Sequence, residues 1–492
     1  MNLADKRLKE LDSPSLTSNE RTLLDCRVAA DLIHGGQYEA ACEALGELWR
    51  GVGERPDSEG MTERATAEVL LQVGALSGWI GASQQIVGAQ DKAKDLISES
   101  AALFEQIGET DRAATAYSDL ALCYWRAGAY DEARILLKNA FEGITEAIGR
   151  TKVILRLVTV EIASGRYNDA FILLTAHAHL FNEQVSHALR GSFYSHLAVV
   201  LKQLGTVEGR PDYLDRAIIE YTAAIHHYEQ AHHDRYRARN ENNLANLLRK
   251  IGHCQQAHEH LDRAQRIYTR LDDAGNLAQV NETRARVFLV EQKYREANRI
   301  IDEVIQTFER GKESALLADA LTVQGVVWAR LGVHQSSLNA LRRAMSIAEE
   351  SGAPVNAGLA ALTLIEEHGA RRLSQTEVYN LYRRADDLLK RTQDPEDIAR
   401  LRASARIVLR RLSGARILDK NFTLHGAVHD FEAKFVEQAL EESGGRVTHA
   451  ARLLGITHQS LALLLKTRHK RLLSKRTPPK RRLRSILKKP KK

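Results

Sequence analysis

The stretch that decides the fold is YSDLALCYWRAGAYDEARILLKNAF, residues 117–141. In it a first helix ends near a glycine, an aromatic residue follows two positions later, and a small residue follows three after that. Gly128 tolerates the left-handed conformation that closes a helix, Tyr130 fills the gap between two helices, and Ala133 lets their backbones approach. The stretch therefore predicts a helical hairpin.

The same spacing returns along most of the chain. Two more copies are plain, at Gly36, Tyr38 and Ala41 and at Gly165, Tyr167 and Ala170. Weaker copies occur at Gly88 with Ala93, Gly252 with Ala257, Tyr294 with Ala297, and Gly332 with His334 and Ser337. Repetition of one hairpin predicts a solenoid with an extended core. We expect this repeat array over residues 20–412, after an N-terminal lead-in over residues 1–19.

The hairpin at residues 117–141 resembles the tetratricopeptide repeat. It carries the family's pattern at Tyr117, Leu120, Ala121, Tyr124, Gly128, Tyr130, Ala133 and Ala140. The family repeats every 34 residues, whereas 37 residues separate Gly128 from Gly165 and 40 separate Gly252 from Gln292. We therefore expect helices or turns about one helical turn longer than in the family. Repeats of this longer kind resemble the sensor arms of some bacterial regulators.

Two segments depart from the hairpin pattern. GTVEGRPDY, residues 205–213, interrupts one hairpin with Gly and Pro, which predicts an enlarged turn. TQDPEDIARLRASARIVLRRL, residues 392–412, follows the point where the repeats degrade, and Asp394 and Pro395 open a helix there. We interpret this last helix as a terminal cap of the array.

A helical solenoid has a concave groove lined by one face of its first helices, and such grooves bind peptides or partner helices. In ARNENNLANLLRK the side chains that fall near groove-facing positions are Arg239, Asn242, Asn246 and Lys250. The resemblance implies that such Asn and basic residues clasp a peptide backbone or carboxylate. The alternative is an ordinary solvated face, which every hairpin has.

The overall composition is that of an almost wholly α-helical protein. Leu, Ala, Glu, Arg and Lys dominate, and Pro occurs only 8 times in 492 residues. Neither an apolar leader in MNLADKRLKELDSP nor a run of about 18 apolar residues occurs, so we expect a cytoplasmic protein. The cysteines Cys26, Cys42, Cys123 and Cys254 lie far apart without CxxC pairing, and we interpret them as core residues in a reducing compartment.

Positive charge is concentrated at the C-terminus. Residues 443–492 contain 16 of the 70 Lys and Arg and none of the 63 Asp and Glu. A local basic block without acidic neighbours suits a polyanion. From Lys466 onward Pro478 and Pro479 would break any continuing helix, so we expect a disordered basic tail over residues 472–492. DNA is the favoured partner of this block; the alternatives are RNA or ribosomes, or a merely solubilising run.

Three short helices precede the tail, after a linker over residues 413–424. The first carries Phe431, Phe435, Val436 and Leu440 on one face and stops at Gly444 and Gly445. The second begins with Thr448 as N-cap, and the third with Thr457 as N-cap. Ala451 is small where two helices cross and Gly455 supplies the turn, while the core residues are expected to be Ala450, Leu454, Ile456, Leu461 and Leu464.

LEESGGRVTHAARLLGITHQSLALLLK, from Leu440, resembles the Fis-type helix-turn-helix, which also ends bacterial enhancer-binding activators. The resemblance implies a DNA-binding domain over residues 425–471 whose third helix reads the major groove. The residues so assigned are Thr448, Thr457, His458, Gln459, Ser460, Ala462, Leu463, Lys466, Arg468, Lys470 and Arg471. One departure stands out, because Ala462, Leu463 and Leu464 occupy the middle of a helix that usually carries Arg or Lys there.

Motifs of catalysis are absent from the sequence. It has no GxxxxGK[ST] phosphate loop, so the ATPase module of enhancer-binding activators is missing, and it has no GxSxG, HExxH or paired CxxC. The one cluster of histidines is His226, His227, His232, His233, His253, His258 and His260. Neighbours in it point to different helix faces and lack a completing ligand set. We therefore expect no enzyme, no cofactor and no metal.

The whole arrangement resembles bacterial tetratricopeptide proteins with an appended Fis-like domain. We expect an all-α regulator of transcription that binds double-stranded DNA, with a protein or peptide partner or signal in the repeat groove and a possible homodimer. The alternative is an adaptor whose repeats carry the function and whose basic end only tethers it to nucleic acid.

Overall fold

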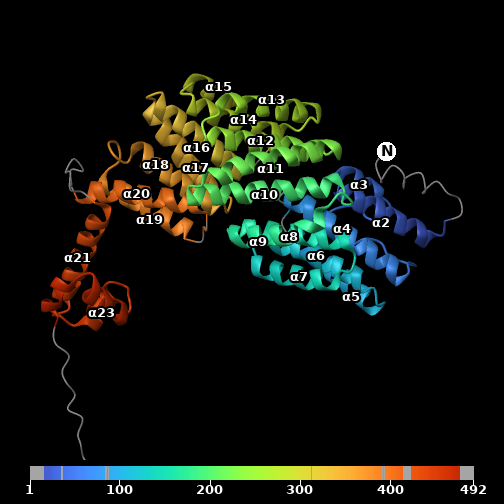
Figure 1. Cartoon of the computed structure of the whole chain (residues 1–492), viewed down its shortest axis with the longest axis horizontal. Helices are drawn as coiled ribbons and strands as arrows, with labels where there is room; N and C mark the ends of the chain where they lie inside the picture. Colours follow the sequence, from blue (N-terminus) through green and yellow to red (C-terminus); the bar gives the residue numbers. More distant parts are fainter. Residues whose placement is uncertain are drawn as a thin grey trace, which may run out of the picture. The chain divides into compact units, whose positions relative to one another are not determined.

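The computed structural model, shown in Figure 1, describes residues 16–34, 37–83, 86, 88–311, 313–390, 392, 394–413 and 423–476. Within these residues all regular structure is helical, which confirms the expected all-α class. The chain divides into two compact units, Met1–Ser404 and Ala405–Lys492. None of the described helices is both long enough and apolar enough to span a membrane.

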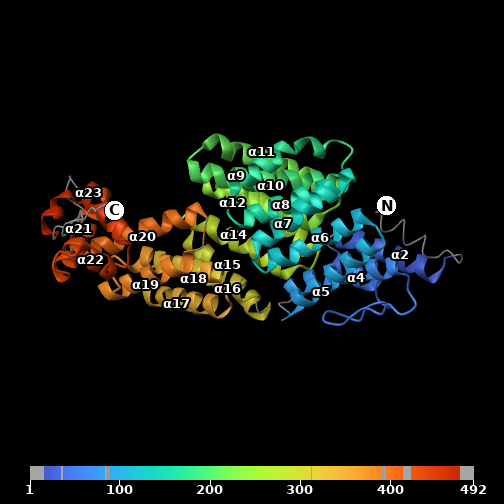
Figure 2. The same cartoon turned by 90° about the horizontal axis from the view of Figure 1, so that it is seen from below.

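The first unit is a succession of helical hairpins (Figures 1 and 2). The first helices of the hairpins are α2 (Ser18–His34), α4 (Glu63–Ser83), α6 (Thr110–Arg126), α8 (Ala147–Ala163), α10 (His187–Glu208), α12 (Asp234–Lys250), α14 (Ala274–Val290), α16 (Ser314–Arg330) and α18 (Pro354–His368). The second helices are α3 (Tyr38–Ala44), α5 (Ala89–Gln106), α7 (Tyr130–Gly143), α9 (Tyr167–Ala176), α11 (Pro211–Gln230), α13 (Cys254–Arg270), α15 (Tyr294–Gly311), α17 (His334–Glu350) and α19 (Gln375–Leu389). A short 3₁₀ helix, η1 (Ala178–Phe181), follows α9, and α20 (Pro395–Ser413) follows α19.

The turns at Gly128 and Gly165 form as the glycine spacing predicts, whereas Gly36, in the first copy of the pattern, lies outside the described residues. Gly128 has φ 76° and Gly165 has φ 74°. After Gly128, the Ala129 amide donates back to the Tyr124 carbonyl at 2.9 Å, which closes the end of α6. Ala133 and Ala170, five residues after these glycines, are fully buried, so the paired helices touch closely there.

The expected enlarged turn at residues 205–213 is wrong. Helix α10 continues through Glu208, and only Gly209 and Arg210 separate it from α11. Gly205 lies inside α10 for a packing reason, because a Cβ there would come within 2.9 Å of Leu214 Cδ2. Glycine and proline together thus mark a lengthened first helix and a tight turn.

The repeat cores are continuous from hairpin to hairpin. First helices pack against the next first helix from α2 to α10 and again from α12 to α18, in addition to packing within each hairpin. All four cysteines are free thiols, and Cys26 and Cys123 lie in these cores. Burial raises the pKa of the Cys123 thiol to about 11, so it remains protonated at neutral pH.

The second unit contains α21 (Leu424–Glu442), α22 (Val447–Leu453), α23 (His458–Thr467) and a 3₁₀ helix, η2 (Lys470–Lys475). Their shared core is Ala433, Val436, Ala439, Leu440, Ala450, Ala451, Leu461, Leu465 and Leu472. Because Leu472 is buried in it, the folded part continues past the expected boundary at residue 471. Residues 477–492, most of the expected disordered tail, lie outside the described residues.

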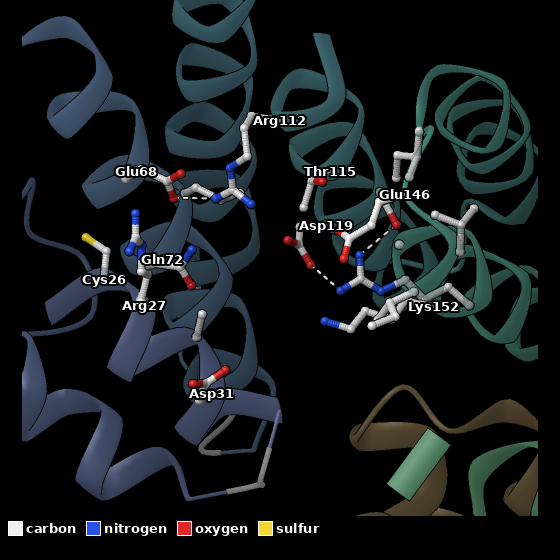
Figure 3. Close-up of a pocket in the computed structure, with 18 of the residues that line it drawn as sticks. Cys26, Arg27, Asp31, Glu68, Gln72, Arg112, Thr115, Asp119, Glu146 and Lys152 are labelled. Carbon is white, nitrogen blue, oxygen red and sulfur yellow. Dashed lines mark hydrogen bonds and ion pairs between the residues drawn. The ribbon is translucent and has the colours of Figure 1, made fainter. Parts of the chain in front are cut away.

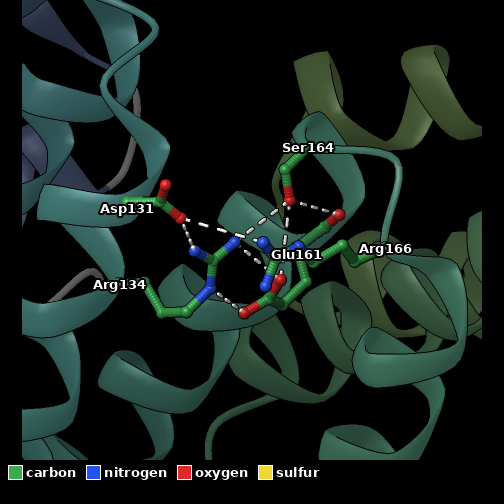
Figure 4. Close-up of polar contacts among 5 residues, drawn as sticks. All are labelled: Asp131, Arg134, Glu161, Ser164 and Arg166. Atoms are coloured by element: carbon green, nitrogen blue, oxygen red, sulfur yellow. Dashed lines mark hydrogen bonds and ion pairs between the residues drawn. The ribbon is translucent and has the colours of Figure 1, made fainter. Parts of the chain in front are cut away.

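A buried ion pair joins α7 to α8, and so fastens one hairpin to the next (Figure 4). Arg134 Nε donates to Glu161 Oε1 at 2.6 Å and Nη2 donates to Oε2 at 3.0 Å. The arginine also contacts Asp131 and Ser164. Arg134 is 8% exposed and Glu161 4%. Both charges are therefore nearly desolvated and depend on each other.

Replacing Arg134 alone should destabilise the array strongly. Arg134→Met leaves the Glu161 carboxylate buried without its partner, and we expect a loss of about 3 to 5 kcal/mol in the free energy of unfolding of the surrounding repeats. The double variant Arg134→Met, Glu161→Leu should recover most of this loss. Urea unfolding followed by circular dichroism checks both, and equal stability of the single and double variants would contradict the assignment.

Candidate functional site

The second unit places a short helix, α23, at the end of a tight turn. Gly455 ends α22 with φ 66°, and the Ile456 amide donates to the Ala451 carbonyl at 3.0 Å. Thr457 then caps α23, because its Oγ1 accepts from the Ser460 amide at 3.1 Å. This N-cap is the one the sequence predicts. The first turn of α23 is thereby held in a fixed orientation.

The exposed end of α23 gathers the side chains assigned to base reading. Thr457, His458, Gln459 and Ser460 are all exposed. The Thr457 and Ser460 hydroxyls lie 2.8 Å apart and bond to each other, while the side chains of His458 and Gln459 form no hydrogen bond with the described residues. Further along the helix Leu463 is 62% exposed. The exposed surface of α23 is therefore polar at its start and apolar in its middle.

Three expectations for these helices are wrong in detail. Helix α22 begins at Val447 with Arg446 as N-cap, so Thr448 is an exposed residue of its first turn rather than the cap. The buried leucine of the last turn of α23 is Leu465, whereas Leu464 is only half-buried. Ile456 is exposed. The tight turn rotates the start of α23 so that positions 461 and 465, four apart, face the core.

The basic side chains around α23 divide into free and engaged groups. Lys466, Lys470 and Arg471 are exposed. Arg468 is exposed but its Nη1 lies 3.7 Å from the carboxylate of Glu432 on α21. Exposed Arg446, the N-cap of α22, and exposed Arg452, in its last turn, add two more positive charges that the resemblance did not indicate. The absence of Asp and Glu from the sequence after Glu442 could have indicated both residues.

Histidines tie the end of α23 to α21. His469 is fully buried and its Nε2 lies 2.9 Å from Glu432 Oε2. His429 Nε2 lies 2.8 Å from the Arg468 carbonyl oxygen, and the two histidine rings are 4.5 Å apart. Lys475 Nζ pairs with Glu437 and Glu441 on α21, at 2.5 Å each. These contacts fix η2 against α21 and leave the N-terminal end of α23 unobstructed within its unit.

In the first unit, the four predicted groove residues lie on α12. Arg239 and Lys250 are exposed, and Asn242 and Asn246 are half-buried. Asn246 Oδ1 accepts from Arg249 Nε at 3.1 Å, and Lys250 pairs with Glu396 at the start of α20. Asn242 Oδ1 is buried and has no hydrogen-bond partner among the described residues. This oxygen therefore retains the capacity to accept one more hydrogen bond.

The first helices also enclose two polar cavities that sequence reasoning missed. One, of about 390 Å³, is lined by α2, α4, α6 and α8, where Arg112 pairs with Glu68 and Arg156 with Asp119 (Figure 3). The other, of about 370 Å³, is lined by α12, α14, α16, α18 and α20. Both are lined by polar residues that successive helices contribute. Only the stacking brings these residues together.

The histidine cluster is dispersed among separate contacts. His258 Nε2 lies 3.1 Å from Glu291 Oε2, His260 contacts Glu241, and His227 Nδ1 lies 2.8 Å from His187 Nδ1. Burial lowers the pKa of His227 to about 4, with Arg190 adding to the effect, so this ring is neutral at physiological pH. Among the described residues no three His, Cys, Asp or Glu gather in a metal-binding arrangement.

Two segments of the chain match known families. Residues 427–466 match the Fis family of bacterial regulatory proteins, and residues 72–146 match the tetratricopeptide repeat. These matches confirm both resemblances found in the sequence. No curated protein matches the chain.

Solved structures share the repeat fold at low sequence identity. The apo form of the quorum sensor NprR from B. thuringiensis superposes with a TM-score of 0.50 at 14% identity, over 70% of this chain and 92% of that one. Aspartyl phosphate phosphatase F from Bacillus subtilis gives a TM-score of 0.47 at 13% identity, over 70% and 88%. A Rap protein complexed with competence and sporulation factor gives 0.45 at 13%, over 80% and 99%.

The correction at the end of α23 is testable in the full chain. Leu465→Ala empties a fully buried position, a loss of about 2 to 5 kcal/mol, and should raise amide hydrogen exchange of α21 and α23 by at least about tenfold. Leu464→Ala, at a half-buried position, should change it by less. Hydrogen exchange read by mass spectrometry measures both, and a larger effect from Leu464→Ala would contradict the packing.

Proposed function

We propose that this protein, in which a tetratricopeptide repeat array precedes a Fis-family helix-turn-helix domain, is a sequence-specific DNA-binding regulator of transcription. The repeat groove receives a protein or peptide partner or signal. The observation that carries the proposal is the start of α23, where four polar side chains are exposed beside a capped helix end. We place the protein in the cytoplasm and assign it no catalytic step.

The recognition helix α23 enters the major groove with its N-terminal end first. The Gln459 amide can form two hydrogen bonds to adenine, and His458 extends the polar surface beside it. The Thr457 and Ser460 hydroxyls suit phosphate or base edges, and the exposed Thr448 lies on the preceding helix. Lys466, Arg468, Lys470 and Arg471 neutralise the flanking phosphates.

The middle of α23 contributes contact without charge. Ala462 and the exposed Leu463 meet thymine methyl groups where other domains of this family place Arg or Lys. Fewer phosphate contacts in the helix leave more of the affinity to the basic C-terminal segment. That share of the affinity is independent of sequence and falls steeply with salt.

Dimerisation supplies a second recognition helix, because one short helix reads too few bases. The surface that suits it is an apolar stripe on α21, formed by Val428, Phe431 and Phe435. Val428 is 44% and Phe435 49% exposed, and the two phenylalanine rings stack edge to face at 4.8 Å. A second copy of the same stripe would bury these side chains across a two-fold axis.

The partner side of the proposal is supported by the groove. Concave first-helix faces hold the orphaned Asn242 oxygen and two polar cavities, which suit an extended peptide or a partner helix. The same repeat fold serves a quorum sensor. A regulator whose repeats bind a signal and whose C-terminal domain binds DNA would give both parts of the chain a function.

Selection of duplex DNA from a random pool by the full chain, at moderate salt, tests sequence specificity. We expect one enriched motif, a palindrome if the protein dimerises. His458→Ala with Gln459→Ala should reduce the preference for that motif over random DNA by at least about tenfold, since each good base contact contributes roughly 1 to 3 kcal/mol of discrimination. Gln438→Ala, an exposed change on α21, is the matched control.

Absence of any enriched motif, with tight binding to random DNA, would favour the adaptor alternative. In that case the exposed, apolar middle of α23 would contact a protein, and the basic end would serve only as a tether.

The dimer interface has its own test. Phe435→Ala removes an exposed aromatic ring from the stripe and should weaken self-association by about tenfold or more in sedimentation equilibrium. Lys434→Ala, an exposed change one residue away and about 100° around α21 from Phe435, should leave it unchanged. A wild-type chain that stays monomeric would sink the dimer proposal.

A further inference from the structure

The start of α20 contacts three first helices of the repeats in its own unit, α10, α12 and α18. Lys250 on α12 forms an ion pair with Glu396, and Gln203 Nε2 on α10 donates to Asp394 Oδ2 at 3.4 Å. Arg400 donates to the Glu366 carboxylate on α18 at 2.8 Å. A segment near residue 395 thus reaches helices almost two hundred residues earlier in the chain as well as its immediate neighbour.

The surface beneath this segment is basic and incompletely paired. Among the described residues no carboxylate pairs with Lys202 of α10, and the Arg249 guanidinium bonds only to the Asn246 amide oxygen. Burial lowers the pKa of the Lys202 ammonium to about 8, and the charge of nearby Lys250 adds to this effect. We name Lys202, Arg249 and Lys250 the basic cluster. Among the described residues, Glu396 is the one carboxylate within ion-pair distance of this cluster, and it contacts Lys250.

The residues that face the basic cluster are acidic. Asp394 directly precedes α20, Glu396 and Asp397 lie in its first turn, and Asp394 Oδ1 accepts from the Glu396 amide at 2.8 Å. Burial acts to raise the pKa of Glu396, but Lys250, Arg249 and Arg400 outweigh it and hold that pKa below its usual value. We name residues 394–397 the acidic turn. It contacts the basic cluster through the ion pair of Glu396 with Lys250, as a bound acidic ligand would.

Space and an unused polar atom remain beside the acidic turn. A cavity of about 640 Å³ is lined by Leu247, Arg249, Lys250 and Glu396, together with residues of the α10 to α11 turn. Two turns before Lys250 on α12 lies Asn242, whose buried Oδ1 has no partner among the described residues. The site therefore holds more binding groups than the acidic turn uses.

We propose that the basic cluster and Asn242 form a binding site for an acidic peptide segment of a partner protein, and that the chain's own acidic turn occupies this site in the partner's absence. The inference rests on the proposed function, in which the groove receives a partner. A partner carboxylate replaces Glu396 on Lys250, a second one pairs with Lys202, and Asn242 bonds the partner's backbone. The acidic turn is displaced because both ligands need the same ammonium groups.

Charge exchange in the full chain tests occupation by the acidic turn. Lys250→Glu and Glu396→Lys each replace the attraction with repulsion, and each should raise hydrogen exchange of residues 394–404 by at least about tenfold. The double variant restores an opposite pair and should return exchange to near the wild-type rate. The contact would be overturned if the single variants exchanged at the wild-type rate, or if the double variant exchanged as fast as the single variants. Lys138→Glu on the exposed surface of α7 is the matched control.

A labelled peptide with the sequence of residues 392–404, TQDPEDIARLRAS, tests the ligand class in trans by fluorescence anisotropy. Full-length Glu396→Lys, with its site open, should bind the peptide at least about tenfold more tightly than the wild type. Lys250→Glu should not bind it, and neither variant should bind a peptide with Asn and Gln in place of the three carboxylates. Equal binding by the wild type and Glu396→Lys, or binding by Lys250→Glu, would overturn the proposal.

The peptide-binding experiment contains no DNA, so its result is independent of the test of DNA-binding specificity. Enrichment of a DNA motif without peptide binding removes the acidic-ligand site and leaves the regulator. Peptide binding without DNA specificity leaves the site and moves the protein to the adaptor class.

Discussion

The close approach of two helices at a single small residue is the constraint on which the repeat array depends. Ala133, Ala170 and Ala257 are fully buried, each five residues after a glycine in the left-handed conformation. A larger side chain at any of them would separate the hairpin, and the next hairpin would lose the surface on which it stacks. Because no single hairpin buries its apolar face alone, the core forms only when hairpins stack. The same stacking places the first helices side by side along one face of the array.

Electrostatics divides the chain into two kinds of surface. Residues before 443 carry 54 Lys and Arg against 63 Asp and Glu, so the repeats are acidic overall, whereas the C-terminal segment has 16 basic residues and no acidic ones. Within the acidic array the basic cluster of Lys202, Arg249 and Lys250 is a local exception. Because it is faced by carboxylates, this cluster presents positive charge to acidic groups, as the C-terminal segment would present it to phosphates.

Prediction from sequence succeeded where local chemistry decides. The glycine turns, the Thr457 cap and the start of α20 at Asp394 and Pro395 each depend on residues within a few positions of one another. It failed where packing between elements decides. Gly205 reads as a turn but provides room for Leu214, and Leu465 rather than Leu464 is buried because α23 is rotated by the turn before it.

The sequence by itself determined the all-helical class and the division of charge, because these follow from periodicity, turn residues and composition. Its motifs at residues 117–141 and 440–466 also carried the resemblances to the tetratricopeptide repeat and to the Fis-type helix-turn-helix. It also indicated Arg239, Asn242, Asn246 and Lys250 as one polar face of a helix. Only the tertiary structure decided what that face meets. Residues 203 and 394 are distant in sequence, and their contact depends on the summed rotation of every hairpin between them, which no local pattern encodes. The basic cluster and the acidic turn are therefore properties of the superhelix and cannot be assigned to any one repeat.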